Sequence, residues 1–325
     1  MIITSKPFIS LLSCGRKMTI SQQGRNELIF AARFSVYSNS VLMALKFMVG
    51  IFTASISILS EAIHSGTDLI AALIANFSVR KSTTPADDGH KFGHGKYESL
   101  SGSIEAFLIL IAAAIIIYEA ITRLIEHSEL RIIEAGIIVM GISASLNFFV
   151  SRYLMRIANK HHSLALEADA LHLRTDVWTS LGVFAGLIIV MVTGINEIDS
   201  FIAIVVAALI INASIRLTRK STRELLDYSL STDEERIIRQ AIAEVIGEDA
   251  SFHEFRTRRS GRERFVDFHL VVPRHLEVKA AHQMCDEIEL RVRSRMPNSS
   301  LTIHVEPCKE NCAECKSAPI CKGAG

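Results

Sequence analysis

Long apolar stretches fill the first two thirds of the chain, and a charged, alternating pattern fills the last third. The most apolar stretch, 177–196, has no charged residue in 20 positions. A membrane-spanning helix needs about 20 mostly apolar residues. The pattern therefore predicts six spans, at about 30–52, 56–80, 100–124, 132–154, 165–194 and 198–217. The alternative is a soluble, all-helical protein with a large core.

Basic residues gather on one side of the predicted spans. That side carries Arg16, Lys17, Arg25, Arg80, Lys81, Lys91, Lys96, Arg152, Arg156, Lys160, Arg216, Arg219, Lys220 and Arg223. The opposite side offers only Arg123 and Arg131. Because short cytoplasmic loops carry the excess of Lys and Arg, we expect a multi-pass protein of the cell (inner or plasma) membrane with both termini in the cytoplasm.

The last third has the periodicities of a small α+β domain. Apolar residues at helical spacing predict a helix over 232–248, which begins T-D-E-E with an N-cap and an acidic first turn. Strands at 252–259 and 264–272 flank Ser260-Gly261, which is typical of a hairpin. A helix at 276–296 and a strand at 300–306 complete an α-β-β-α-β order. In these strands, Val266, Phe268, Leu270, Val272, Leu301, Ile303 and Val305 are expected to face the core.

The composition agrees with this division. The 325 residues are 49% hydrophobic and 21% charged, with a net charge of +1. Residues 101–220 hold 19 charged side chains, whereas the shorter range 231–300 holds 25. A chain with this apolar content is not expected to be disordered. Its net charge near zero argues against nucleic-acid binding. Residues 7–14 do not resemble a signal peptide, and both Met1 and Met18 are candidate starts.

Two ionisable pairs interrupt the apolar spans. His64 and Asp68 lie in the second predicted span, and His172 and Asp176 in the fifth. Residues four apart share one helix face, and an ionisable residue within a membrane indicates a functional site. Together the pairs supply four N/O ligands, the number that tetrahedral Zn²⁺ requires. The alternative is a buried His–Asp hydrogen bond within each helix.

Longer motifs resemble those of the cation diffusion facilitators, proton-coupled exporters of divalent metals. They are SILSEAIHSGTDLIAALIA, PADDGHKFGHGKYESL, EADALHLRTDVWTSLG, FHEFRTRRSGRERFVDFHLVV and TIHVEP. The resemblance covers about residues 28–307. It implies a six-helix transmembrane domain and a cytoplasmic, α+β ferredoxin-like (metallochaperone-like) domain. We expect an N-terminal tail over 1–27, these domains over 28–228 and 229–307, and a Cys-rich tail over 308–325.

The resemblance also assigns metal sites. His64, Asp68, His172 and Asp176 match the family's transport site, with the first His typical of members that prefer zinc. Asp87, His90 and His94 match a second site in a loop, although such a loop could equally be solvated. His253, His269, His282 and His304 match a cytoplasmic cluster, in which Glu306 replaces the usual aspartate.

Further polar residues have weaker assignments. Lys96 and Asp227 match a charged pair that braces the family's dimer, with Arg258 as a third member; separately solvated charges are the alternative. Lys46 and Glu105 are interpreted as snorkelling or packing residues. Cys308, Cys312, Cys315 and Cys321 suit a structural Zn²⁺ or an Fe–S cluster, or belong to an unstructured tail.

The expected function is therefore efflux of divalent metal, Zn²⁺ first, in exchange for protons by a homodimer in the lipid bilayer. Transport of Fe²⁺, Co²⁺, Ni²⁺ or Cd²⁺ is the alternative within this class. A membrane metal sensor without transport is the alternative from another class. The sequence has no H-E-x-x-H motif that would favour a membrane metalloenzyme.

Overall fold

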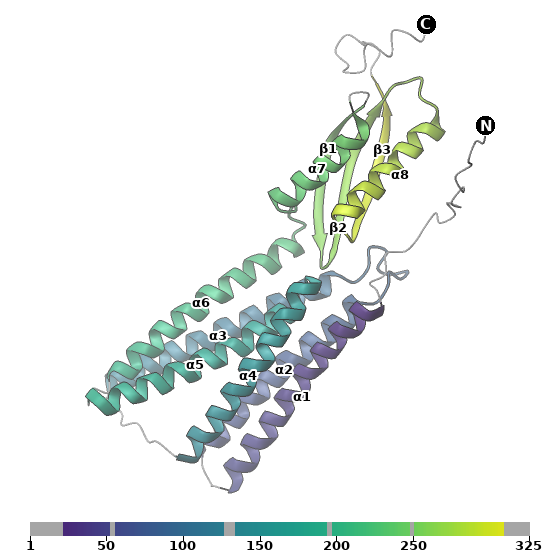
Figure 1. Cartoon of the computed structure of the whole chain (residues 1–325). Helices are drawn as coiled ribbons and strands as arrows, with labels where there is room; N and C mark the ends of the chain where they lie inside the picture. Colours follow the sequence, from purple (N-terminus) through teal and green to yellow (C-terminus); the bar gives the residue numbers. More distant parts are fainter. Residues whose placement is uncertain (1–21, 53–55, 127–133, 194–196, 248–249, 309–325) are drawn as a thin grey trace, which may run out of the picture.

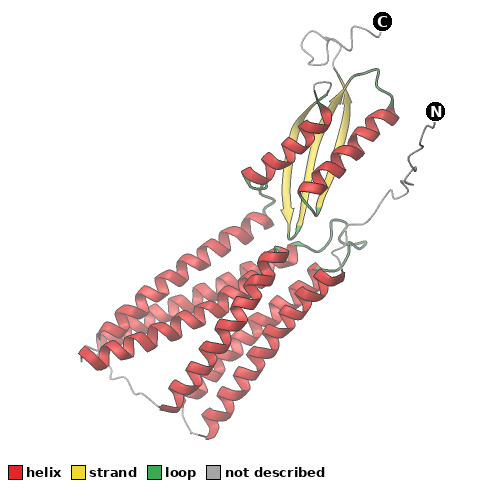
Figure 2. Cartoon of the chain, in the orientation of Figure 1, coloured by secondary structure: helices red, strands yellow, loops and turns green. Residues whose placement is uncertain are grey.

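Six long helices form a bundle, and a smaller α+β domain stands at one end of it (Figures 1 and 2). The computed structural model describes residues 22–52, 56–126, 134–193, 197–247 and 250–308. The bundle consists of α1 (Gln22–Phe52), α2 (Ile56–Ser82), α3 (Lys96–Glu126), α4 (Glu134–His161), α5 (Leu164–Thr193) and α6 (Glu197–Leu225). These helices coincide in order with the six predicted spans.

The outer surface of the bundle is apolar. Phe30, Phe77, Phe107, Phe149, Trp178 and Phe201 are all exposed. Among the described residues, four helical segments are long and apolar enough to cross a membrane: Gln22–Phe52, Ala62–Ser82, Lys96–Thr122 and Ser200–Leu225. Exposed aromatic side chains along helices of this length are suited to lipid contact.

The interior of the bundle holds small and polar side chains. Helix α3 packs along α6, α1 along α2, and α4 along α5, while α5 also contacts α2, α3 and α6. Many of the fully buried residues are alanines, such as Ala71, Ala106 and Ala168, which allow close approach of helices. Helix α5 thus lies against α2, which carries His64 and Asp68, the predicted partners of its own His172 and Asp176.

The smaller domain has the predicted α-β-β-α-β order. It contains α7 (Thr232–Ile246), β1 (Ser251–Ser260), β2 (Glu263–Val272), α8 (Val278–Arg295) and β3 (Ser299–Pro307). The sheet order is β1-β2-β3, antiparallel between β1 and β2 and parallel between β2 and β3. Gly261 turns the predicted hairpin with a φ of +60°. This arrangement confirms the α+β expectation.

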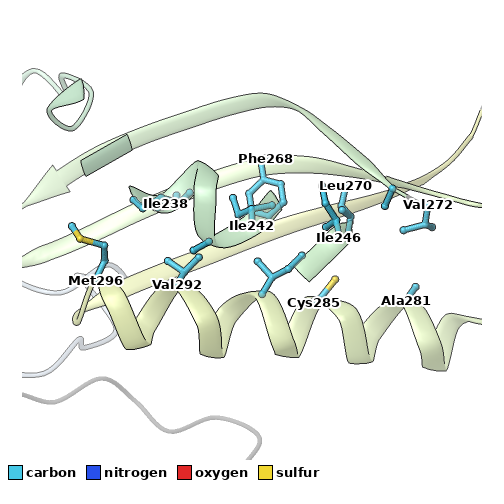
Figure 3. Close-up of a cluster of buried hydrophobic side chains, with 14 of the residues drawn as sticks. Ile238, Ile242, Ile246, Phe268, Leu270, Val272, Ala281, Cys285, Val292 and Met296 are labelled. Atoms are coloured by element: carbon cyan, nitrogen blue, oxygen red, sulfur yellow. The ribbon is translucent and has the colours of Figure 1, made fainter. Parts of the chain in front are cut away.

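Both helices cover one face of the sheet and leave the other open. Residues of α7 and α8, including Ile242 and Val292, pack on Phe268 and Leu270 of β2 (Figure 3). The alternation of β2 is as predicted, but Val305 is 39% exposed, so its assignment to the core was wrong. Val305 lies near the end of β3, and β3 is an edge strand.

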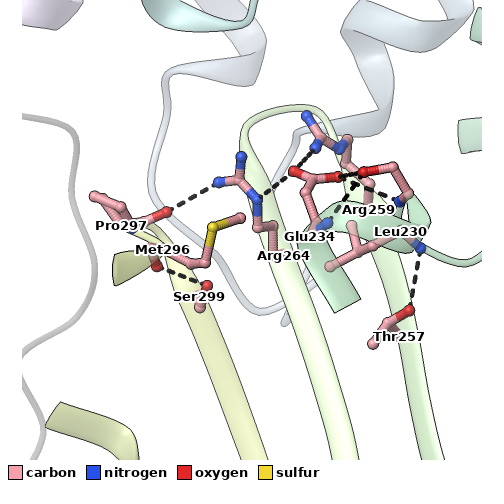
Figure 4. Close-up of polar contacts among 9 residues, drawn as sticks. Leu230, Glu234, Thr257, Arg259, Arg264, Met296, Pro297 and Ser299 are labelled. Atoms are coloured by element: carbon pink, nitrogen blue, oxygen red, sulfur yellow. Dashed lines mark hydrogen bonds and ion pairs between the residues drawn. The ribbon is translucent and has the colours of Figure 1, made fainter. Parts of the chain in front are cut away.

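The start of α7 is fixed by capping and ion pairs. The N-cap is Ser231, not the predicted residue after it: its hydroxyl accepts from the Glu234 N–H, and the Glu234 carboxylate accepts from the Ser231 N–H. Glu234 also binds Arg259 of β1 and Arg264 of β2 (Figure 4). One carboxylate therefore caps the helix and ties it to the hairpin.

The tip of the β1–β2 hairpin contacts the bundle. Arg262 at the tip binds Glu98 of α3 at 2.5 Å, and both side chains are buried. Gly95, just before α3, lies so close to the turn that an added Cβ would be 2.3 Å from the Ser260 carbonyl oxygen. This contact places the smaller domain directly over the α2–α3 loop.

Candidate metal sites

The predicted transport residues lie together between α2 and α5. Nε2 of His172 is 3.1 Å from Oδ1 of Asp68, and Nε2 of His64 is 4.0 Å from the same oxygen. Ligand atoms of His64, Asp68 and Asp176 all lie within 4.8 Å of one another. Asp68 and His172 are buried, while His64 is exposed. Four candidate ligands from two helices thus lie close together, with His64 at the exposed edge of the group.

Polar residues from other helices surround this group. The Asn147 amide of α4 donates to Oδ2 of Asp176 at 3.4 Å. The Lys46 ammonium of α1 donates to the Ser65 hydroxyl at 2.8 Å, next to His64. Sequence reasoning did not select Asn147, although a lone amide in an otherwise apolar span was the available signal. Such outer partners orient metal ligands.

Of the two roles expected for Lys46 and Glu105, snorkelling or packing, the structure shows packing. Lys46 is 6% exposed and Glu105 is fully buried, so neither extends to the bundle surface. The Lys46 ammonium bonds inward, to a side chain of α2. One Glu105 oxygen accepts from the Ser101 hydroxyl at 3.2 Å, and the other has no hydrogen-bond partner. Both residues pack inside the bundle instead.

The three loop residues also form a group. Asp87 lies 3.1 Å from Nδ1 of His90 through one oxygen and 3.1 Å from Nε2 of His94 through the other. Thr84 lies 3.1 Å from the second ring nitrogen of His94. Desolvation raises the pKa of Asp87, but hydrogen bonds from His90 together with the charges of His94 and His90 bring that pKa below its ordinary value. The anionic form suits a metal ligand.

In the smaller domain, histidines form a row across the open face of the sheet. His253 of β1 pairs with His269 of β2, which pairs with His304 of β3. Glu306 lies 2.8 Å from Nδ1 of His269 and 3.6 Å from Nε2 of His253. Strand pairing brings these four residues together, even though they are distant in sequence. The Glu306 side chain, which is longer than the usual aspartate, reaches His269 in the middle of the row.

Two observations depart from the predicted cluster. His282 is exposed on α8, which packs on the opposite face of the sheet, so within one chain it does not join the row. Glu254, which was not predicted, lies 3.6 Å from Nε2 of His269. The strand register shifts between His253 and Arg256, and Glu254 has a φ of +48°. Regular strand alternation would direct Glu254 to the opposite face of the sheet, but this bulge places it beside the histidines.

Lys96, Asp227 and Arg258 lie together where the two domains join. The Lys96 ammonium is 3.0 Å from Oδ1 of Asp227, and Arg258 is 3.4 Å from the same oxygen. Desolvation raises the pKa of Asp227, but the hydrogen bond from Lys96 and both positive charges bring it below its ordinary value. Of the predicted cysteines, Cys308 is buried at the end of β3. Cys312, Cys315 and Cys321 lie outside the described residues.

Both domains of the chain are similar to known proteins. Residues 32–226 match the model of the cation efflux transmembrane domain, and residues 230–308 match that of the cation efflux protein cytoplasmic domain. An uncharacterized transporter of Synechocystis, sll1263, is 33% identical over 279 residues, covering 86% of this chain and 90% of its own. The cation-efflux pump FieF of Cronobacter sakazakii is 30% identical, covering 83% and 89%. FieF of Pectobacterium carotovorum is 31% identical, covering 82% and 88%.

Proposed function

The chain belongs to the cation efflux family, and on that premise we propose that it exports Zn²⁺ from the cytoplasm in exchange for protons. Relatives carry the name cation-efflux pump, which supports divalent-cation efflux as the general activity. The observation that carries the choice of metal is the convergence of two imidazoles and two carboxylates from α2 and α5. Zn²⁺ is bound by such N/O ligands in tetrahedral sites.

The same four residues explain how metal and protons compete. Metal binding requires deprotonated carboxylates and neutral imidazoles, so each Zn²⁺ displaces protons from Asp68, Asp176 and the two histidines. Protein ligands replace the water of the ion at a depth where water is excluded. Rearrangement of the helices then exposes the loaded site to the opposite side, where protons displace the metal.

We assign supporting roles to the other two groups. Asp87, His90 and His94 form a loop site that holds a second metal ion. The row of His253, His269 and His304 with Glu306 holds metal on the smaller domain, with Glu254 as a further ligand. His282 contributes only if a second copy of the chain brings it to this face, as a homodimer of cytoplasmic domains would allow.

Charge supports the proposed orientation and assembly. The excess of Lys and Arg on one side of the bundle favours a cytoplasmic location for both termini and the α+β domain. The cluster of Lys96, Asp227 and Arg258 lies at this side and braces the membrane domains of the homodimer. The loop site and the histidine row therefore face the compartment from which metal is taken.

The test is zinc flux into proteoliposomes under an imposed pH gradient. Asp176→Ala removes one transport ligand and is expected to abolish flux, whereas Asp233→Ala removes an exposed carboxylate of α7 and is expected to leave it unchanged. Transport by Asp176→Ala at the wild-type rate would refute the assigned site. Competition by Fe²⁺, Co²⁺, Ni²⁺ and Cd²⁺ in the same assay tests the choice of metal. Zinc flux that is independent of the pH gradient would refute antiport.

A further inference from the structure

Two buried carboxyl groups lie near the transport site but belong to none of the groups of candidate metal ligands among the described residues. Glu105 of α3 is fully buried, and Asp169 of α5 is 1% exposed. One oxygen of Glu105 has no hydrogen-bond partner, and the one polar partner near the two Asp169 oxygens is the Ser35 hydroxyl of α1. Nδ1 of His172, on the same helix face as Asp169, is also without a partner. Several unsatisfied polar atoms thus occur together inside the bundle.

Among the described residues, His172 is the one basic side chain near the two acids, and it already lies against the Asp68 carboxylate. Ser101 donates to Glu105, and Ser35 of α1 is the polar side chain beside Asp169. The ionisable neighbours of the two acids are each other, His172 and the Asp68 carboxylate. Alanine and isoleucine side chains, among them Ala106, Ala168 and Ile109, line the same α3–α5 contact. A buried carboxylate without a partner is costly, so the neutral acid or a bound cation is favoured.

The geometry favours a proton over a metal ion as the cation that neutralises these two acids. Among the described residues, no group of three ligand atoms within 4.8 Å of one another includes Glu105 or Asp169. A metal needs several ligands around one point, whereas a proton needs one oxygen. The two acids are also not exposed to water in this conformation, so hydrated metal does not reach them.

We propose that Glu105 and Asp169 form a proton-binding site of the transport cycle that is separate from the metal ligands. This inference rests on the proposed metal/proton exchange. Asp169 lies about 8 Å along α5 from its start at Leu164, and His172 about 12 Å, so the acid precedes the metal ligands from the cytoplasmic side.

The coupling is electrostatic and reciprocal. Zn²⁺ at Asp68, His172 and Asp176 places two positive charges near both acids and favours their ionised forms. Each carboxyl group then loses H⁺ from its O–H to water on the side to which the site is open and becomes a carboxylate. When these carboxylates take protons again, the local negative charge falls and Zn²⁺ binds more weakly. Metal and protons thus displace each other without sharing ligand atoms.

The number of protons released per bound Zn²⁺ tests the proposal. Purified full-length protein is titrated with Zn²⁺ in weakly buffered detergent solution containing a pH indicator. Glu105→Gln and Asp169→Asn mimic the neutral acids, so each variant should release roughly one proton fewer than wild type while still binding Zn²⁺. Glu119→Gln is the matched control, because Glu119 is exposed on the same helix as Glu105 and should release the wild-type number.

Infrared difference spectra provide a second measurement that does not depend on variants. Metal-free wild type should show the carbonyl stretch of protonated carboxyl groups, and Zn²⁺ should reduce it. The proposal is overturned if this band is absent without metal, or if both variants release as many protons as wild type. Failure of the proposed function looks different: wild type would then show no zinc flux, or flux that ignores the pH gradient.

Discussion

The buried ion pair between Arg262 and Glu98 should hold the α+β domain on the bundle. Arg262 at the hairpin tip donates to Glu98 at 2.5 Å, and the Ser82 hydroxyl donates to the same oxygen at 2.7 Å. The Arg262 side chain is 8% exposed and that of Glu98 is 1% exposed. Around them, the turn at Gly261 fits against Gly95 without space for a Cβ on either residue. Arg262→Met removes the charge and keeps most of the apolar stem.

The expected magnitude follows from burial. Removing one partner of a buried ion pair leaves the other charge uncompensated and costs about 3–5 kcal/mol. Ser82 still donates to Glu98, so the lower end applies. At about 1.4 kcal/mol per tenfold change, 3 kcal/mol raises the population of the undocked hairpin roughly 100-fold. The double variant Arg262→Met/Glu98→Gln should be less destabilised than the sum of the two single variants, because no charge is then buried alone.

Hydrogen exchange of the full-length protein measures this directly. Peptides covering 92–98 and 260–264 should exchange faster in Arg262→Met by up to about two orders of magnitude. Arg236→Met is the control, since Arg236 pairs with Asp233 on an exposed turn of α7. An exposed pair is worth about 0–1 kcal/mol, so exchange at the hairpin should not change. If these peptides of Arg262→Met exchange at the wild-type rate, the idea that this pair holds the domains together is refuted.

Three further predictions concern the α+β domain. Gly261→Ala places a Cβ about 2.9 Å from the Gly95 carbonyl oxygen at a positive φ, so the melting temperature of the domain should fall; an unchanged value would contradict this packing. Phe268 is 1% exposed, so Phe268→Ala should leave a cavity in the core and lower the free energy of unfolding by about 3–5 kcal/mol, measured by urea denaturation. Desolvation raises the pKa of Glu234, but its two arginine partners outweigh it and lower that pKa. The stability that Glu234 contributes is therefore complete above its ordinary pKa and lost as the pH falls through the native value, so Glu234→Gln should flatten acid unfolding below about pH 4.

Most secondary structure followed from periodicity. Apolar length predicted the positions of six helices, and alternation predicted the strands and the core face of β2. The errors occurred where a local feature of tertiary origin decided the outcome. Val305 has the parity of a core residue, but it lies near the end of an edge strand. Glu254 has the parity of the opposite face, but a bulge turns it toward His269.

The transport-site residues were selected by chemistry and the other metal sites by resemblance to a family, and the grouping of all of them came from packing. An i, i+4 spacing places His64 with Asp68 on one helix, but only the contact between α2 and α5 sets Nε2 of His172 at 3.1 Å from Asp68. Lys46 and Glu105 show the limit of hydropathy: each lowers the apolar average of its span, yet sequence position alone does not tell whether the side chain extends out to the interface or inward. The bundle buries both.

By itself, the sequence determined which segments are helices or strands, which residues can ligate metal, and on which side the positive charges gather. These properties depend on side-chain type and on short-range spacing. The tertiary structure alone decided that His282 lies apart from the histidine row, that Arg262 reaches Glu98, and that Glu105 and Asp169 are buried near the metal ligands. Those relations join residues far apart in the chain, and they depend on how helices and strands pack, which no local pattern encodes.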